Sequence, residues 1–181
     1  MSFLMSFLAS LPLTNRQIPW LIFAISVSAL GSALIFEHVG GLAPCDLCLQ
    51  QRVPYWVLIP AALLAGALSR EANLGIAPLA LIALCVVAAS VNVGIAGYHA
   101  GVEYKWWEGP TGCTGGGLMA GSLAELKQQL AGVKVPRCDE IAWSLFGISM
   151  AGYNFLISLG LVALGILPLL RYWTATGVEE E

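Results

Sequence analysis

Four long runs without a charged side chain constrain this fold more than any other feature of the sequence. They cover residues 17–36, 53–69, 72–102 and 141–170. A helix needs about 20 residues, within a range of about 17 to 25, to cross the hydrocarbon core of a bilayer. The first, third and fourth runs meet this length easily, and the second only just. Because 58% of the residues are hydrophobic and 10% are charged, we expect a membrane protein.

The predicted fold class is an all-α membrane protein, a four-helix transmembrane bundle in a single domain. We expect spans at about 18–36, 53–69, 75–97 and 145–169, with loops at about 37–52 and 98–144. Inside the longer loop, "GSLAELKQQLAG" places Ser122 and Glu125 in capping-box spacing ahead of an apolar face. This segment is expected to form a short interfacial helix. The formal net charge of -3 is too small and scattered to indicate nucleic acid as a partner.

The first sixteen residues carry an apolar stripe at helical spacing. A short helix lying on the membrane surface would show this pattern, and so would a frayed apolar tail. A secretory signal fits less well, because no basic segment precedes the apolar stretch. The doubled "MSFL" leaves open whether Met1 or Met5 is the start. The stripe consists of Phe3, Leu4, Phe7, Leu8 and Leu11.

An even number of spans places both termini on one side of the membrane. Basic residues near the spans do not decide which side this is, because equal numbers flank the two sides. Four of the five cysteines, Cys45, Cys48, Cys113 and Cys138, fall on the side opposite the termini, whereas Cys85 lies mid-span. Disulfides persist in the bacterial periplasm. We therefore expect a bacterial inner membrane protein with cytoplasmic termini and periplasmic redox loops, and we expect Cys85 to pack as a small hydrophobic residue.

The stretch "PCDLCLQQR" contains a Cys-x-x-Cys pair, Cys45 and Cys48, followed by Arg52. Two cysteines at this spacing can form a strained, reducible disulfide, and a nearby cation or helix N-terminus lowers the pKa of a thiol. On a continuous helix Arg52 would lie one turn from Cys48 and could stabilise its thiolate. Pro54 disfavours that continuity and indicates that the second span begins there. The simpler alternatives are a static disulfide and an arginine that anchors the membrane edge.

Three interpretations compete for the four cysteines on that side. A four-cysteine zinc site would require two closely spaced pairs, and only Cys45 and Cys48 have that spacing. The second interpretation is a pair of structural disulfides in a nonenzymatic membrane protein. The third is a relay that passes electrons between two dithiol pairs and on to an acceptor in the membrane. A strained cysteine pair at the lipid boundary beside an arginine fits the relay better than it fits a purely structural disulfide.

Three segments together resemble a known family. The segments "PCDLCLQQR", "GYHAGVEYKWWEGPTGC" and "VPRCDEIAWSLFGISM", in this order among four spans, closely resemble the bacterial disulfide bond formation protein B (DsbB) family. The likeness extends from about Ile18 to Leu170. Its specificity lies in the combination, since a lone Cys-x-x-Cys would be weak.

The resemblance implies a function and roles for the matched residues. In the family, the disulfide that corresponds to Cys113 and Cys138 oxidises DsbA, a thioredoxin-fold partner in the periplasm, with Cys113 forming the mixed disulfide. The pair that corresponds to Cys45 and Cys48 then reoxidises it, by way of a Cys45 to Cys138 bridge, and Cys48 meets ubiquinone or menaquinone.

Two further positions match residues near the family's quinone. Arg52 matches an arginine adjacent to the quinone, and His99 aligns with a histidine near the same site. From the residues alone, His99 could equally be an interfacial side chain bonded to water or backbone.

The function expected from these features is that of a membrane thiol–quinone oxidoreductase. The alternative is a nonenzymatic four-span scaffold stapled by disulfides. A quinone reductase similar to vitamin K epoxide reductase is a neighbouring enzymatic hypothesis, although its cysteines are arranged differently.

Overall fold

The computed structural model describes residues 13–69, 75–110, 113 and 136–176. Within these residues the protein is mostly helical. The long helices are α2 (Gln17–His38), α4 (Val53–Leu68), α5 (Ile76–Glu103) and α7 (Met150–Thr176), and a short helix, α3 (Asp46–Gln50), precedes α4. The predicted interfacial helix at 121–132 and the stripe up to residue 12 lie outside the described residues.

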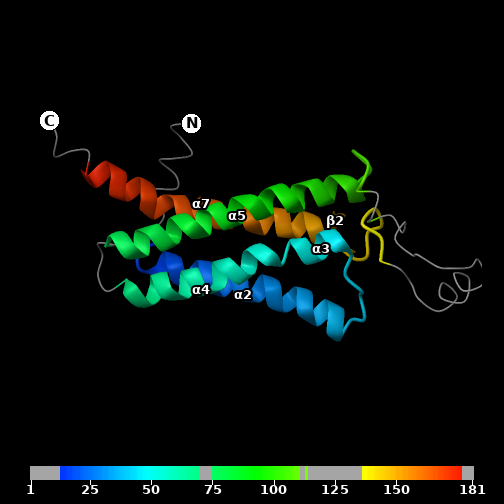
Figure 1. Cartoon of the computed structure of the whole chain (residues 1–181), viewed down its shortest axis with the longest axis horizontal. Coiled ribbons are helices and arrows are strands. Elements are labelled where there is room, and N and C mark those ends of the chain that lie inside the picture. The colour runs from blue at the N-terminus through cyan, green and yellow to red at the C-terminus, as the bar shows by residue number, and fades with distance from the viewer. Residues whose placement is uncertain (1–12, 70–74, 111–112, 114–135, 177–181) are drawn as a thin grey trace, which may run out of the picture.

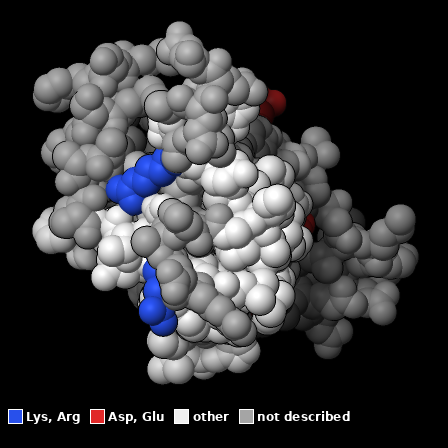
Figure 2. All heavy atoms as spheres, turned by 90° about the vertical axis from the view of Figure 1, so that its left-hand side faces the viewer, with Lys and Arg blue, Asp and Glu red and all other residues white. Residues whose placement is uncertain are grey.

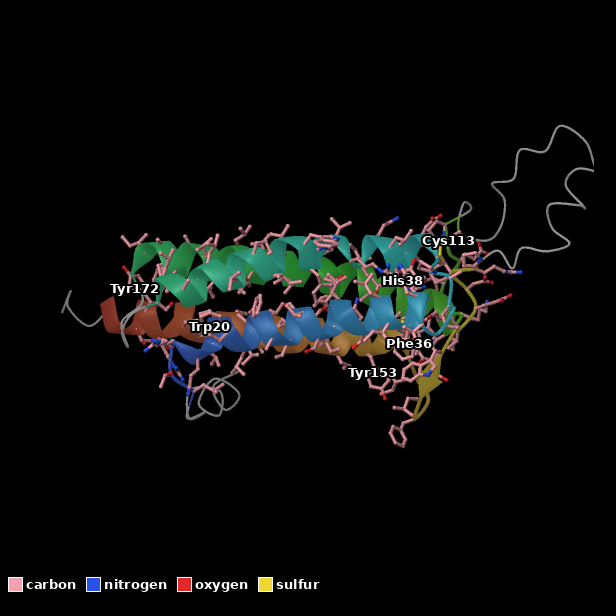
Figure 3. The ribbon with its side chains drawn as sticks, turned by 90° about the horizontal axis from the view of Figure 1, so that it is seen from below. Trp20, Phe36, His38, Cys113, Tyr153 and Tyr172 are labelled. Atoms are coloured by element: carbon pink, nitrogen blue, oxygen red, sulfur yellow. A yellow bond between two sulfur atoms is a disulfide. The ribbon has the colours of Figure 1, made fainter. Side chains whose placement is uncertain are left out.

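Three of the described helices are long and apolar enough to cross a membrane: Gln17–His38, Ile76–Glu103 and the Met150–Thr174 part of α7. Aromatic side chains lie toward both ends of the bundle, as membrane–water interfaces favour. Figure 3 shows Trp20 and Tyr172 toward one end and Phe36 and Tyr153 toward the other.

Helix α4 has 16 residues and falls just short of the length expected for a span. It begins at Val53 with Pro54 in its first turn. Backbone N–H groups in the first turn have no partner within the helix, so the missing N–H of a proline costs no hydrogen bond there. This agrees with the predicted start of the second hydrophobic segment. The chain turns at Gln51 and Arg52, so α3 and α4 are separate helices rather than one.

The four long helices lie side by side along the long axis of the molecule (Figure 1). α5 packs against α4 and α7, and α2 packs against α4 and α7. Large apolar side chains such as Ile22, Leu58 and Leu161 are buried between them, together with small alanines. Gly165 marks a close approach of α7 to α5, since a Cβ there would lie 2.5 Å from Val86 Cγ2. Cys85 is free and buried in this core, as expected for a small hydrophobic residue.

The two ends of the bundle differ. α2 begins and α7 ends at one end, whereas α2 and α5 finish at the other, beside α3 (Figure 1). The end where α2 begins exposes basic side chains, and acidic ones are visible only at its rim (Figure 2). The opposite end carries Cys113 and its disulfide (Figure 3).

A small β-hairpin precedes α7, which the all-α prediction did not include. β1 (Ser144–Leu145) pairs antiparallel with β2 (Ile148–Ser149). The two turn residues between the strands, Phe146 and Gly147, have φ angles of 50° and 79°. Positive φ at both positions is typical of tight hairpin turns, but asparagine or aspartate usually stands where Phe146 does. The turn therefore lacks the sequence pattern by which hairpins are normally predicted.

Candidate active site

The Cys-x-x-Cys pair lies at the N-terminus of α3. Cys45 has extended backbone geometry and caps the helix, and its sulfur accepts a hydrogen bond from the Cys48 backbone N–H at 3.4 Å. The two sulfurs are 3.0 Å apart, and both cysteines are free. Pro44 favours the extended entry because it holds its own φ near -65° and has no N–H. The local sequence thus places Cys45 where helix N-termini stabilise negative charge.

The second pair reaches the same place from the other side of the sequence. Cys113 and Cys138 form a disulfide, and both are buried beside Cys45, Leu47 and Val102. The sulfurs of Cys45 and Cys138 lie within 4.8 Å of each other. The structure therefore brings together all four cysteines that the sequence singled out.

His99 lies beside Cys45. It projects from α5 and is only 2% exposed. Its Nε2 atom is 3.6 Å from the Cys45 sulfur, and its Nδ1 atom is 2.7 Å from Nε2 of Gln51. The predicted loop at 98–144 would contain His99, but α5 continues to Glu103 and carries it on a helix. Its partners are buried side chains, so it is not an interfacial residue bonded only to water or backbone.

A chain of buried polar groups continues from His99 into the bundle. Asn154 donates to Gln51 Oε1 at 2.6 Å, and Tyr55 donates to Asn154 Oδ1 at 2.6 Å. Asn92 donates to Ser158 at 2.9 Å and to Asn154 at 3.3 Å. The sequence analysis missed these residues. The available signal was the single asparagine within each of α5 and α7, since polar residues within a membrane are costly and are retained mainly for packing or function.

Arg52 occupies a different position from the one a continuous helix would give it. Because the chain turns before α4, its guanidinium pairs with Glu37 near the end of α2, and the Arg52 side chain is 16% exposed. The helix break was expected from Pro54, whereas the Glu37 partner comes from tertiary structure. Arg52 still lines the same cavity as Cys45 and Cys48.

The pKa values of the two thiols are shifted in opposite directions. A hydrogen bond from Cys48 and a second from His99 outweigh burial and lower the pKa of Cys45 to about 4. The pKa of Cys48 is raised, because Cys48 shares its proton with the Cys45 sulfur and is buried. The role expected for Arg52 at a Cys48 thiolate stays a prediction. In this state of the pair the two shifts favour the thiolate at Cys45.

A cavity of about 760 Å³ adjoins the cysteine pair. This volume lies within the range of about 300 to 1,000 Å³ typical of small-molecule sites. One wall follows α2 from Phe36 to Ala24, which corresponds to roughly 18 Å at 1.5 Å per residue. The polar lining includes Cys45, Cys48, Gln51, Arg52, Tyr55, His99, Glu103 and Asn154, and the apolar lining includes Ile25, Ala29, Ala33, Phe36, Ala151 and Ile157.

A flat conjugated ring with two carbonyl groups and a long apolar tail matches this lining. Arg52 offers guanidinium N–H donors beside the two free thiols, and the α2 and α7 walls offer apolar surface for a tail. These residues fit a membrane quinone. Cys45, His99 and Cys138 also have ligand atoms close enough to hold a metal ion, but the sulfur of Cys138 is engaged in the disulfide.

The family comparison agrees with this arrangement. The profile of the family described as "Disulfide bond formation protein DsbB" matches residues 15–167. The chain belongs to the DsbB family. The match covers the cysteines of both pairs, Arg52, His99 and the helices that hold them.

Individual relatives in the DsbB family match most of the chain. A disulfide bond formation protein B of Methylococcus capsulatus is 29% identical over 84% of this chain and 91% of its own. One from Verminephrobacter eiseniae is 31% identical over 85% and 86%. A disulfide bond formation protein B 1 of Pseudomonas aeruginosa is 44% identical, but over 32% of this chain and 36% of its own. No solved structure gave a significant match.

The difference in acidity between the two thiols gives a direct prediction. With the Cys113–Cys138 disulfide intact and the first pair reduced, ultraviolet absorbance should show one thiolate above about pH 5. It should be lost as the pH falls through about 4, the pKa of Cys45. A Cys85→Ala background removes the only other free thiol among the described residues. Cys45→Ala should abolish this low-pH step. A single step near pH 8 to 9, about the ordinary cysteine range, would contradict the assignment.

Proposed function

We propose that this DsbB family member is a membrane thiol–quinone oxidoreductase. It reoxidises a DsbA-like thiol oxidoreductase in the periplasm and passes the electrons to ubiquinone or menaquinone in the membrane. The observation that carries the proposal is that Cys45 lies within 4.8 Å of the Cys138 sulfur and within 3.0 Å of the Cys48 sulfur. One sulfur therefore adjoins both redox pairs, and the cavity lies against it.

The exchange begins at the Cys113–Cys138 disulfide. A partner thiolate attacks Cys113, and Cys138 leaves as a thiolate. The partner's second thiol closes the partner's own disulfide and releases Cys113. Both cysteines are buried, but the Cys138 sulfur lies within 4.8 Å of the Cys45 sulfur. Cys138 is therefore assigned to the exchange with Cys45, and Cys113 to the partner. Two electrons have then moved from the partner to this pair. The partner's two protons pass to solvent, from which an expelled thiolate of high pKa, such as that of Cys48, is reprotonated.

The next two exchanges move the electrons to the first pair. Cys138 attacks Cys45 in the Cys45–Cys48 disulfide, forms a Cys45–Cys138 bridge and expels Cys48. Cys113 then attacks Cys138, restores the Cys113–Cys138 disulfide and expels Cys45 as a thiolate. A leaving sulfur of low pKa departs faster, and the pKa of Cys45 is lowered to about 4. The result is the arrangement in the structure, with Cys45 and Cys48 free and the other pair joined.

The remaining step closes the Cys45–Cys48 disulfide. When bound, a quinone would supply the acceptor for two electrons and two protons, one proton from Cys48 and the other from solvent. Cys48 surrenders its proton as its sulfur bonds to the Cys45 thiolate. Arg52 orients the ring by donating N–H groups, and Glu37 holds the guanidinium in place. His99 stabilises the Cys45 thiolate until the disulfide closes.

The topology proposed for this activity has four spans. α2 and α5 both finish at the cysteine end, so the segment between them must return along the bundle, and α4 follows that course (Figure 1). α4 therefore serves as a short fourth span. Both termini lie on the cytoplasmic side, and the two cysteine pairs lie at the periplasmic face of the inner membrane, where disulfides persist.

The activity can be tested with purified protein, a reduced DsbA-like partner and a soluble quinone. Quinone absorbance should fall, and partner disulfide should form in equal amount, at a rate that depends on enzyme concentration. A variant with both Cys45→Ala and Cys48→Ala should show only the uncatalysed rate. Equal rates with and without the wild-type protein would support the nonenzymatic scaffold instead.

The roles of the two cysteines in the second pair give a further prediction. Cys138→Ala removes the resolving sulfur, so Cys113 should accumulate a mixed disulfide with the partner, visible on a nonreducing gel. Cys113→Ala should accumulate far less, because Cys138 is buried against Cys45. Cys85→Ala serves as the control for general cysteine loss. Equal trapping by the two variants would remove Cys113 as the attacked sulfur.

Arg52 can be tested by a conservative replacement. Arg52→Lys keeps a positive charge but loses the planar fork of donors. The KM for quinone should rise about tenfold, which corresponds to about 1.4 kcal/mol of binding. Single-turnover oxidation of the partner without quinone should be retained. Glu37→Gln should raise KM in the same direction, because it releases the guanidinium. Arg16→Lys, at the opposite end of the bundle, is the matched control. If Arg52→Lys leaves the quinone kinetics unchanged, Arg52 serves only to anchor the helix end at the membrane.

A further inference from the structure

Gln51 connects two parts of the site through one amide. Its Nε2 atom bonds to the Leu47 carbonyl oxygen at 3.2 Å and to His99 Nδ1 at 2.7 Å. A carbonyl oxygen can only accept, so the NH₂ end of the amide must face Leu47. The same nitrogen then donates its second hydrogen to His99. Nδ1 of His99 is therefore the acceptor.

The rest of the polar chain supports the same orientation of the amide. Gln51 Oε1 accepts from Asn154 Nδ2 at 2.6 Å. Asn154 Oδ1 in turn accepts from the Tyr55 hydroxyl at 2.6 Å and from Asn92 at 3.3 Å. If the amide of Gln51 were reversed, its NH₂ group would face the NH₂ group of Asn154, and its oxygen would face the carbonyl oxygen of Leu47. Side chains on α4, α5 and α7 thus fix which atoms donate and which accept along this chain of hydrogen bonds.

This direction determines where the proton of a neutral His99 resides. An imidazole whose Nδ1 accepts carries its hydrogen on Nε2. Nε2 lies 3.6 Å from the Cys45 sulfur and 3.9 Å from Glu103 Oε1. We infer that Gln51, oriented by Asn154 and Tyr55, is a positioning residue that fixes His99 as the Nε2–H tautomer, so that His99 donates to the Cys45 sulfur.

The catalytic use of this tautomer rests on the proposed function. Cys45 is the sulfur expelled when Cys113 restores the second disulfide, and a donor already aimed at it stabilises the departing thiolate. Gln51 and Asn154 touch neither sulfur. They act through His99 and are positioning residues rather than catalytic ones.

The same geometry argues against a metal at this site. The ligand atoms of Cys45, His99 and Cys138 lie within 4.8 Å of one another, which is close to what a tetrahedral zinc site needs. A metal at Nε2 requires the lone pair there and a hydrogen on Nδ1, usually donated to an acceptor. Gln51 presents a donor to Nδ1 instead. The amide chain therefore selects a thiolate partner for His99 over a metal.

Several titratable groups share this environment. Cys45 and Cys48 face His99 from α3, Glu103 lies one turn along α5, and the Cys138 sulfur is in the disulfide. One carboxylate oxygen of Glu103 has no hydrogen-bond partner among the described residues. Glu103 also competes for the Nε2 hydrogen, at a slightly greater distance. The tautomer must therefore be measured directly.

The chain has only two histidines, which makes this measurement clean. In His38, Nδ1 lies 3.0 Å from the Leu34 carbonyl oxygen, so His38 should carry its hydrogen on Nδ1, the opposite tautomer. Full-length protein labelled with ¹⁵N-histidine, reduced at the first pair, is studied by NMR at about pH 8.5, two units above the ordinary histidine pKa of about 6.5. His38→Gln assigns the signals.

The expected result is a His99 spectrum of the Nε2–H tautomer in the wild type. Gln51→Met keeps the side-chain length but removes the donor, and it should abolish the preference. The matched control is Gln50→Met, because Gln50 is the exposed neighbour. An Nδ1–H or doubly protonated His99 in the wild type, or a tautomer unchanged by Gln51→Met, would overturn the inference.

A second readout follows the Cys45 thiolate itself. In Gln51→Met the ultraviolet titration of Cys45 should move upward by about one pH unit, a tenfold change in the acid equilibrium. Asn154→Leu should move it less, because Leu47 still orients the amide of Gln51. No shift in Gln51→Met would count against the inference. Neither measurement needs quinone or partner, so failure of the proposed activity and failure of this inference are distinguishable.

Discussion

The hydrogen bond between Gln51 and His99 joins the cysteine-bearing segment to the helical bundle. Gln51 follows α3, and its partners lie on α5 and α7, while Tyr55 on α4 completes the chain. In an apolar surrounding an unpaired amide costs several kcal/mol, roughly 2 to 7. Each of these polar groups therefore restricts the position of the next. The location of the Cys-x-x-Cys pair relative to α5 depends on that chain.

The turn at Gln51 and Arg52 separates two functions that a continuous helix would combine. It lets α3 present its N-terminus and Cys45 toward His99, while Arg52 turns away to Glu37. Hydrogen bonds from Cys48 and His99 then lower the pKa of Cys45. The guanidinium is left available to a ligand in the cavity. A single charge serving both purposes would be neutralised by the thiolate it stabilised.

The sequence predicted much of this architecture, and its omissions have physical causes. Charge-free runs predicted the helices, and the start at Pro54 followed from proline geometry. The meeting of Cys45 with Cys138 was expected from the family resemblance. The Arg52–Glu37 pair, the Gln51–Asn154 chain and the contact of His99 with Cys45 depend on residues far apart in the sequence. The hairpin turn at Phe146 was missed because phenylalanine rarely adopts positive φ.

The central position of Cys45 explains why its acidity matters more than that of Cys48. A sulfur that exchanges with two partners must be a good leaving group toward one and a good nucleophile toward the other. Lowering the pKa of a thiol improves the first and weakens the second, since nucleophilicity falls with basicity. Cys48 and His99 lower the pKa of Cys45 against the opposing effect of burial. The proton kept on Cys48 has the complementary effect, since it holds the second sulfur inactive until an acceptor is bound in the cavity beside it.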